Sequence, residues 1–480
     1  MKKFFFKSND SFDIEKNCEY LIKEIDKSLL DESFKKWSMK INTYLDIPLE
    51  EINFFVKKNI FNAYDFKNNK LKKKMSFFLF PIYLFMSFVY FVIINIFRQK
   101  KIKDVQNFHL LIDDLKSQRE LNRYKKLVSL FKENCIAIRK SNNSEMSFKN
   151  CFVFYQKRFI DYKLKKNFLN FFMEMIKLSF ILSFKLNINF LYIFLNFLDD
   201  YLFYDTLFSK FNFKYLLTHT HYNTDNIKNY LLKSKCNGVS TVIQKNINSK
   251  NQTSFFYHAD VIFTYSDLIN INKNASSKIN KQVSIGSFFM EYYYYTKPSH
   301  TKEYYDIMCL GGNEHYPNSA NDRTKYHRTD YIEHLNWLIK ISKEYPNLSI
   351  GFMHHANNKN NFEKNFLNGT NIKIINQNKN SYEISNNSKL ICSWASSMVI
   401  ELLSLEKNCF YLDPGFRNHQ FLGNIDISYN LRIKSYENFK DVIKNLLIDK
   451  KNLKTEGNDN LKNLCLNSEN CSQKIYEFMN

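Results

Sequence analysis

The chain has 480 residues, 44% of them hydrophobic and 24% charged, which is enough for several domains and a sizeable core. The first 237 residues contain no glycine, so the first half has no glycine-rich phosphate loop, because such loops need backbone without a Cβ. The formal net charge is +22, but Lys outnumbers Arg 60 to nine. Arg is the residue best suited to read base edges, so we expect no nucleic-acid partner, whereas an anionic membrane surface stays a candidate.

The nine cysteines form no CxxC pair, and several lie in apolar runs such as DIMCL and LICSW. Buried free thiols in a reducing compartment explain this pattern. The N-terminal stretch MKKFFFKSNDSFDIEK has no signal-peptide apolar core. We therefore expect the protein at the cytoplasmic face of the inner or plasma membrane.

Residues 1–105 form the first predicted region, which is helical and carries an apolar segment at 75–97. The segment has 23 residues without a charge and basic residues on both sides, among them Lys72–Lys74 and Lys100–Lys101. This length and these flanks predict a membrane-associating helix. A buried core helix is the alternative. Pro81 and Asn95 are compatible with a bent, re-entrant or monotopic element, so a full crossing is not predicted.

Residues 106–295 form the second predicted region, a Rossmann-like acceptor domain. We expect a charged helix at 106–133, strands at 135–139 and 151–155, and long aromatic amphipathic helices between 168 and 211, whose apolar face packs in the core or rests on a bilayer. Strands at 214–218, 239–244, 261–265 and 282–285 follow, with a helix at 223–236 that Gly238 ends. The alternation predicts an α/β fold with a parallel sheet.

Residues 300–455 form the third predicted region, a second α/β half that follows the polar connection EYYYYTKPSH. We expect strands at 305–310, 348–353, 371–375, 389–393 and 409–412, and helices at 330–345, 396–405 and 436–447. In the tail, 456–480, we expect a last helix at 459–478. In one arrangement, this helix crosses back to the first half. The two halves should meet near 287–303.

Four groups of polar or glycine residues follow strands of the second half. They are Gly311 with Gly312, His354 with His355, Ser393 with Ser396 and Ser397, and Asp413. Ligands of doubly wound sheets bind at the carboxyl ends of the strands, so parallel strands would bring these groups to one edge. The alternatives are a plain turn at the glycines and solvated histidines.

The segment LICSWASSMVIEL is the most specific of these. Ser396 and Ser397 open a predicted helix, where backbone N–H groups favour an anion. Glu401 comes one turn after Ser397, on the same face, where a carboxylate can accept hydrogen bonds from a ribose diol. The alternative is a helix cap followed by a solvent-facing Glu.

The segment SNNSKLICSWASSMVIELLSLEKNCFYLDPG resembles the nucleotide-sugar motif of GT-B glycosyltransferases, especially those of bacterial capsule and surface-carbohydrate biosynthesis, and LGGNEHYPN and YPNLSIGFMHH are similar to their upstream motifs. The resemblance implies a GT-B fold, two Rossmann-like domains facing a cleft. It also implies metal-independent transfer with no cofactor, and donor contacts from Gly311, Gly312, His354, Ser396, Ser397 and Glu401. The sequence departs from the family at His354-His355, where His-Pro is expected, and at Gln244-Lys245-Asn246, where Gln-His-Gly is expected.

The catalytic base is expected in the first half, facing the cleft. The strand at 214–218 leads into His219, His221 and Asp225, any of which can deprotonate an acceptor hydroxyl. The alternative has Asp225 capping the next helix and the histidines solvated. The pairs in LIDD and FLDD lie in segments predicted to be helical, so neither predicts a metal-binding DxD motif.

These observations favour a membrane-associated glycosyltransferase that moves a sugar from a nucleotide-sugar donor to a lipid-linked or growing surface glycan. A nucleotide-sugar epimerase of similar fold is one alternative. A non-catalytic membrane scaffold of a glycan-assembly complex is the other. Donor binding without turnover would favour the scaffold.

Overall fold

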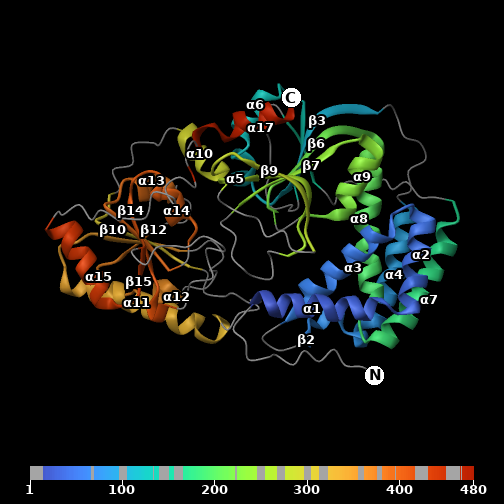
Figure 1. Ribbon diagram of the computed structural model, residues 1–480, viewed down its shortest axis with the longest axis horizontal. Helices are drawn as coiled ribbons and strands as arrows, with labels where there is room; N and C mark the ends of the chain where they lie inside the picture. Colours follow the sequence, from blue (N-terminus) through green and yellow to red (C-terminus); the bar gives the residue numbers. More distant parts are fainter. Residues whose placement is uncertain are drawn as a thin grey trace.

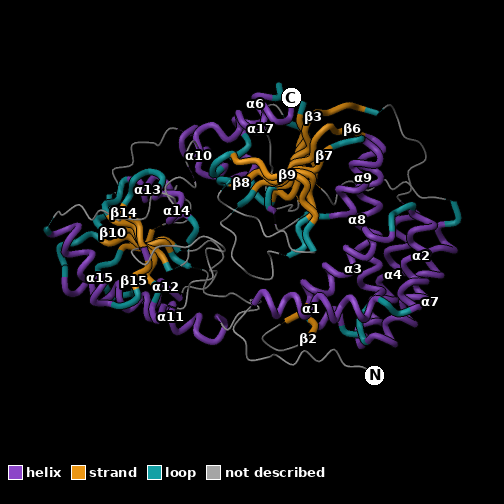
Figure 2. Tube along the Cα trace, in the orientation of Figure 1, coloured by secondary structure: helices purple, strands orange, loops and turns teal. Residues whose placement is uncertain are grey.

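The computed structural model describes residues 14–65, 70–96, 105–132, 134–139, 151–155, 166–221, 224–245, 255–267, 276–296, 304–312, 323–354, 362–375, 381–394, 396–416, 431–449, 465 and 468–480. Figure 1 shows three parts: a helical layer, a first α/β half above and beside it, and a second α/β half at the far side of the molecule. Apart from the short strand β2 beside α1, the labelled strands gather in two separate groups (Figure 2). The predicted α/β class with two parallel sheets is therefore confirmed.

The helical layer begins with three of the predicted N-terminal helices, α1 (Ile14–Leu29), α2 (Glu32–Leu45) and α3 (Leu49–Ala63). The Asp31 carboxylate accepts a hydrogen bond from Ser33 N, which fixes the start of α2. A two-stranded hairpin, β1 (Tyr64–Asp65) and β2 (Lys70–Leu71), follows α3. It was not predicted, because two-residue strands leave no periodicity in the sequence.

The apolar segment at 75–97 forms the end of η1 (Lys73–Met75), then η2 (Phe77–Leu79) and α4 (Phe80–Ile96). Several of its large apolar side chains are exposed, with Phe78 at 86% and Phe85 at 69%, so α4 is not the buried core helix that was the alternative. Of the helices that the structure describes, none has both the length and the apolar character needed to cross a membrane. The basic flank at 98–103 lies outside the described residues.

The predicted long aromatic helices are α7 (Phe168–Leu186) and α8 (Phe190–Lys210). Phe77 of η2 contacts Phe180 and Phe184 of α7 through their rings, so α4 and α7 lie side by side. We call the exposed apolar side chains on these two helices and on η2 the α4–α7 apolar surface; its members are Phe78, Ile82, Phe85, Met86, Phe88, Val89, Val92, Leu169, Met173, Phe180, Ile181 and Phe184. In contrast, α8 is largely buried between this surface and the first half.

The first sheet is parallel and has the order β5-β4-β3-β6-β7-β8-β9. Its strands are β3 (Gln106–Leu115), β4 (Cys135–Arg139), β5 (Phe152–Tyr155), β6 (Phe211–Thr218), β7 (Val239–Ile243), β8 (His258–Thr264) and β9 (Lys278–Ser284). The chain winds outward from β3 in one direction, then returns through α7 and α8 to place β6 on the other side of β3. The switch point of this doubly wound sheet therefore lies between β3 and β6.

The predicted charged helix at 106–133 is wrong. Its first part is the central strand β3, and only α5 (Gln118–Asn122) and α6 (Lys125–Leu130) are helical. The strand is buried over its last six residues, including Asp113 and Asp114. Two adjacent acids look like the polar face of a helix, and the partners that allow their burial come from distant parts of the chain.

The helix predicted at 223–236 is α9 (Asn226–Cys236), and its end differs in one detail. Asn237, not Gly238, adopts the left-handed conformation that stops the helix, with φ of 50°. Gly238 is needed for another reason, since a Cβ there would lie 2.6 Å from Phe213 O. The glycine thus lets the chain pass close to β6.

The second sheet has the order β12-β11-β10-β13-β14-β15, and all its strands are parallel. They are β10 (Ile307–Leu310), β11 (Ile350–Met353), β12 (Lys373–Ile375), β13 (Leu390–Ser393), β14 (Asn408–Leu412) and β15 (Arg432–Ile433). Its helices are α11 (Arg323–Glu344), α12 (Phe362–Phe366), α13 (Ser381–Asn386), α14 (Met398–Leu403) and α15 (Tyr436–Ile443), which continues as a π-helix to Ile448. The five predicted strands are confirmed, and the switch point lies between β10 and β13.

The two halves are joined by α10 (Phe288–Thr296) and by the tail helix α17 (Cys471–Met479). The polar connection is thus partly helical. The tail helix lies on the first half, beside α6, in agreement with the crossing arrangement (Figure 1). Tyr476 contacts Phe131, and Phe478 contacts Phe263, through their rings.

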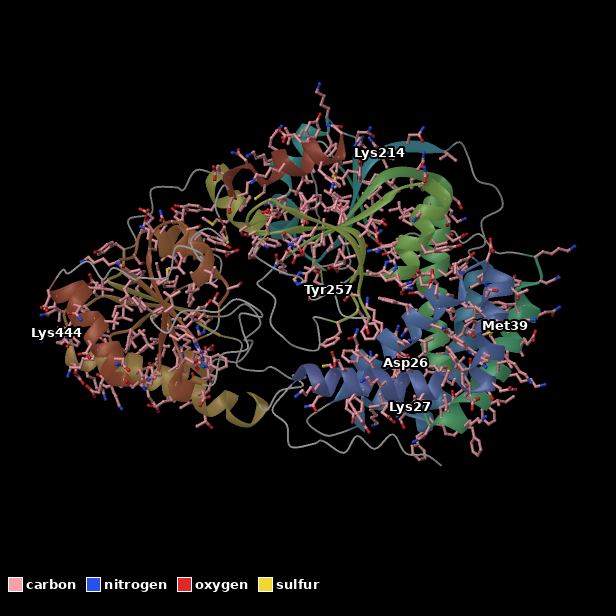
Figure 3. All side chains as sticks on the ribbon, in the orientation of Figure 1. Asp26, Lys27, Met39, Lys214, Tyr257 and Lys444 are labelled. Atoms are coloured by element: carbon pink, nitrogen blue, oxygen red, sulfur yellow. The ribbon has the colours of Figure 1, made fainter. Side chains whose placement is uncertain are left out.

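Lysines lie on all three parts of the molecule. Figure 3 shows Lys27 on α1, Lys214 on β6 and Lys444 after α15, on three separate parts of the surface.

Candidate functional site

The carboxyl edge of the second sheet brings the predicted donor-binding groups together. Leu310 at the end of β10 lies opposite Met353 of β11 and Ser393 of β13. Gly311, His354 and the segment after Ser393 therefore emerge at one edge, at the switch point of the sheet. This is the place where an open parallel sheet offers a crevice for a ligand.

The two glycines hold tight positions at this edge. Gly311 N donates to Met353 O at 2.8 Å, and Gly312 N donates to the Tyr331 hydroxyl at 3.2 Å. A Cβ on Gly312 would lie 3.1 Å from the Trp394 ring and 3.2 Å from the Tyr331 ring. A side chain at 312 would therefore need one of these two aromatic rings to shift by a few tenths of an ångström. Its role as a phosphate contact stays a prediction.

His354 is held in place by a buried carboxylate that was not predicted. Glu363 has no exposed surface; its Oε2 lies 3.2 Å from His354 Nδ1, and its Oε1 accepts a hydrogen bond from the Tyr331 hydroxyl at 3.0 Å. Among the described residues, His354 Nε2 has no hydrogen bond. Tyr331 thus couples Gly312 to Glu363 and His354, and this network leaves one imidazole nitrogen for a ligand. His355 lies outside the described residues.

The three predicted serines have different roles. Ser393 is buried, donates to Leu310 O at 2.8 Å and accepts from Ser396 N at 3.0 Å, so it stabilises the strand end. Ser396 Oγ accepts from Met398 N at 3.3 Å. Ser397 precedes the first residue of α14 and makes no side-chain capping bond. The helix is shorter than the predicted 396–405, which reduces the dipole available for an anion.

Glu401 was expected to face an open crevice, and the structure instead buries it. Only 3% of the residue is exposed, and its carboxylate accepts hydrogen bonds from the Ser287 hydroxyl at 2.6 Å and the Tyr382 hydroxyl at 2.5 Å. Burial raises the pKa of Glu401 above its ordinary value, against the effect of these hydrogen bonds. Ser287 begins the connection between the halves, so Glu401 ties the second half to it. A ribose diol would have to replace one of these two hydroxyls.

Asp413 forms a structural ion pair at the end of β14. Its Oδ2 accepts hydrogen bonds from Arg432 Nη2 at 2.5 Å and Arg432 Nε at 3.1 Å, and Asp413 is 1% exposed. This pair attaches β15 to the sheet. The predicted donor contact of Asp413 has no geometric support beyond its position at the same edge.

The three predicted catalytic residues lie at the carboxyl end of β6. His219 is fully buried, with Nδ1 2.8 Å from the Tyr124 hydroxyl and Nε2 3.6 Å from Glu120 Oε1, which is too long for a hydrogen bond. Burial lowers the pKa of His219, so its imidazole is neutral near pH 7. A neutral imidazole is the form that can accept a proton.

The other two predicted catalytic residues have structural partners. His221 Nδ1 accepts a hydrogen bond from Lys245 N at 3.1 Å. Asp225 caps α9, since its Oδ1 accepts from Ile227 N at 2.9 Å and Lys228 N at 3.3 Å. This capping is the alternative that the sequence left open for Asp225. The histidines, however, are buried and not solvated.

A buried charge cluster at the first switch point was missed because LIDD was assigned to a helix. Asp113 Oδ2 pairs with Lys228 Nζ at 2.7 Å and accepts from the Tyr204 hydroxyl at 3.0 Å, and both charged side chains are at most 2% exposed. Asp114 Oδ2 accepts from the Thr220 hydroxyl at 2.5 Å. Within the described part of the chain, no group of three or more His, Cys, Asp and Glu side chains is arranged to hold a metal ion.

Two further cations belong to the first half: Arg123, which the sequence did not single out, and Lys245 of the Gln244-Lys245-Asn246 segment. Arg123 lies over the Phe289 ring at 4.8 Å, and its positive charge acts to lower the pKa of Glu401 on the opposite half. Lys245 Nζ lies 3.9 Å from Glu120 Oε1, and burial lowers the pKa of Lys245. Arg123 and Lys245 of the first half therefore lie near each other, and the charge of Arg123 reaches Glu401 of the second half.

No protein-family model matches this chain, and no curated protein matches it. Solved structures similar to it include a putative UDP-N-acetylglucosamine 2-epimerase from Listeria monocytogenes (9% identity, 78% of this chain and 95% of that chain, TM-score 0.46). The UDP-N-acetylglucosamine 2-epimerase from Rickettsia bellii is similar at 13% identity, over 77% of this chain and 95% of that chain, with a TM-score of 0.45. Acinetobacter baumannii MurG is similar at 8% identity, over 78% and 99%, with a TM-score of 0.37. With TM-scores below 0.5, these likenesses carry no conclusion about the activity of this chain.

Proposed function

We propose that this chain is a glycosyltransferase that binds a nucleotide-sugar donor at the carboxyl edge of the second sheet and transfers the sugar to a glycan or lipid-linked acceptor held by the first half. One observation carries the proposal. Gly312, His354, Ser396 and Ser397 lie together at the switch point of a doubly wound parallel sheet, and α14, which follows Ser397, meets the connection between the halves through Glu401 and Ser287. Hydroxyls, a glycine and an imidazole suit the phosphates of a nucleotide.

The cations of the first half support the same arrangement. Arg123 and Lys245 lie near the junction, where the charge of a donor diphosphate would develop on the leaving group. Positioned cations stabilise such charge in the transition state. His219, which is neutral and on the same half, is the proposed general base. Because His219 is fully buried, an acceptor hydroxyl reaches Nε2 only if Phe289 or its neighbours move.

We also propose that the α4–α7 apolar surface rests on the anionic leaflet of a membrane. The surface has twelve exposed large apolar side chains on adjacent helices. Large apolar patches of this kind on a protein surface mark sites that contact another protein or a membrane. Lys73 and Lys74 are exposed at one end of this surface, where they would meet lipid headgroups. A bilayer contact there would bring the enzyme to a lipid-linked acceptor.

The donor site is tested by calorimetric titration of UDP, GDP, ADP and CMP into the wild type and two variants. Ser396→Ala and His354→Ala should weaken the binding of the preferred nucleotide, His354→Ala by about tenfold, which corresponds to roughly 1.4 kcal/mol. Ser349→Ala is the matched control, because Ser349 bonds Asp306 at the opposite, amino edge of the same sheet. If Ser396→Ala and His354→Ala bind the nucleotide as tightly as the wild type and Ser349→Ala do, the assignment of the donor site is wrong.

Product analysis separates transfer from the two alternatives. With a nucleotide sugar and a glycan acceptor, a transferase releases the nucleotide and extends the acceptor. An epimerase would change the sugar and leave it attached to the nucleotide. Donor binding with neither product would favour the non-catalytic scaffold.

Membrane binding is tested by flotation with phosphatidylglycerol and phosphatidylcholine vesicles. Phe78→Ser with Phe85→Ser should reduce binding to the anionic vesicles at least several-fold. Ile448→Ser, which changes an exposed apolar side chain on the second half, is the control. Unchanged flotation of the double variant would contradict the surface assignment.

A further inference from the structure

A cavity of about 490 Å³ lies between the helical layer and the carboxyl edge of the first sheet. Its walls come from α3, from α8, from the end of β3 and from the start of α9. The volume is within the range of small-molecule sites. The cavity is separate from the second sheet, so the proposed donor site does not account for it.

The charge of this cavity differs from that of the whole chain. Its charged lining residues are four aspartates and two lysines: Asp114, Asp199, Asp200, Asp225, Lys58 and Lys116. The chain carries a formal charge of +22, yet this lining has an excess of two negative charges, four minus two. A nucleoside diphosphate is therefore disfavoured here, and a neutral ligand with hydrogen-bond donors is favoured.

The rest of the polar lining is rich in amides, from Asn59, Asn62, Asn196 and Asn226. Carboxylates accept hydrogen bonds and amides both donate and accept, which suits the hydroxyl groups of a sugar. Asn226 donates to Glu51 Oε2 at 2.7 Å, and its buried Oδ1 has no hydrogen bond within the described structure. Phe55 adds an apolar wall.

Several of these groups are held rigidly. Asp225 caps α9, Asp114 accepts from Thr220, and Lys58 Nζ donates to Thr224 O. Rigid polar groups bind a ligand with less loss of conformational entropy. The lining is thus arranged before a ligand arrives.

The cavity lies one helix away from the α4–α7 apolar surface. The Tyr90 hydroxyl of α4 donates to Asp199 Oδ1 of α8 at 3.2 Å, and Asp199 lines the cavity. If a lipid-linked ligand places its sugar in the cavity, its lipid tail would pass α8 and α4 and reach the α4–α7 apolar surface.

We propose that this cavity binds a sugar unit of the acceptor, other than the one whose hydroxyl reaches His219, through its hydroxyl groups. This inference rests on the proposed transfer to a glycan acceptor. It assigns α3 and α8 of the helical layer, together with the end of β3, as the acceptor-binding elements.

The probe is a set of methyl glycosides of glucose, galactose, N-acetylglucosamine and ribose, measured by saturation-transfer NMR with the full chain. At least one glycoside should bind the wild type, and Asn196→Leu and Asp200→Asn should each weaken its binding by about tenfold, the loss of roughly one hydrogen bond to the sugar. Asn365→Leu, the same change on the exposed side of α12, is the control. Thermal melts of all variants should match the wild type, since Asn196 and Asp200 are only half-buried.

Three results would overturn the inference: no glycoside binds, the two cavity variants bind as the wild type does, or a nucleoside diphosphate competes with the glycoside. Tight binding of Mg²⁺ or Ca²⁺ that Asp200→Asn removes, without glycoside binding, would also overturn it. Nucleotide titrations separate this result from the donor proposal. Glycoside binding without nucleotide binding supports the cavity and contradicts the donor site, and nucleotide binding without glycoside binding does the reverse.

Discussion

The two switch points share one topology and differ in chemistry. At the first, between β3 and β6, the strand ends carry a buried ion pair of Asp113 and Lys228 with a neutral His219 beside it. At the second, between β10 and β13, the edge consists of glycine, serine and His354. The charged groups of the first edge are paired with each other, whereas His354 Nε2 at the second edge has no hydrogen bond among the described residues. The proposed donor site therefore lies at the edge where an imidazole nitrogen stays available to a ligand.

The largest loss of stability should come from removing the buried ion pair at the first switch point. Lys228→Met removes the cationic partner of the buried Asp113 carboxylate, which should cost about 3–5 kcal/mol of unfolding free energy. A lower urea midpoint would show this. The double variant Asp113→Asn with Lys228→Met should recover part of the loss, because no uncompensated charge remains. An unchanged midpoint in Lys228→Met would mean that the cluster does not stabilise the first half.

The next effect concerns a buried histidine of the second half. His334 has no exposed surface, and burial lowers its pKa from 6.5 to about 4. The folded state therefore favours the neutral ring, and roughly 3 kcal/mol of stability is present above pH 6.5 and is lost as the pH falls toward 4.

The measurement is the urea midpoint of the wild type and His334→Gln at pH 7 and pH 5. The wild type should lose more stability than the variant between these two values. His219, whose pKa is also lowered by burial, contributes in the same direction to both proteins. Equal losses in the two proteins would contradict the assignment to His334.

A pair of hydroxyl deletions compares the two edges directly. Thr220→Val removes a hydrogen bond to the buried Asp114 carboxylate and should cost about 1.5–3 kcal/mol. Ser396→Ala removes a capping bond of 3.3 Å at a half-buried position and should cost about 1 kcal/mol or less. Thermal melts of both variants test the order, and a larger loss in Ser396→Ala would reverse the comparison.

The smallest expected effect is on the pH dependence of stability. It concerns Glu401, which accepts a hydrogen bond from Ser287 in the connection between the halves. The pKa of Glu401 is raised by burial, so the stability that its protonated form contributes is fully present below the unfolded pKa near 4.5 and is lost as the pH rises through the folded value. Glu401→Gln has no such group. The stability of the wild type relative to Glu401→Gln should therefore fall from pH 5 to pH 8, as read from urea midpoints. A constant difference would mean that Glu401 ionises normally.

Much of the second half could be predicted from the sequence. Its strands are short apolar runs that end in glycine, histidine or serine, and its helices have clear stop signals such as Pro346. Parallel pairing then brings the strand ends to one edge without further information. The sequence could not show Glu363, which reaches His354 from a short helix, because no local pattern marks a buried acid that pairs across a sheet edge.

The first half was harder to predict, and the reason is burial of charge. The sequence determined the helical layer, the long aromatic helices, the parallel class of the sheet and the exposed apolar segment, because each of these leaves a periodicity or a run of apolar residues. Only the tertiary structure decided that 106–115 is a strand, that Glu401 is buried between Ser287 and Tyr382, and that α3 and α8 enclose a polar cavity. In each case the deciding partner lies far away in the chain, so its contribution to the free energy exists only when the fold has formed.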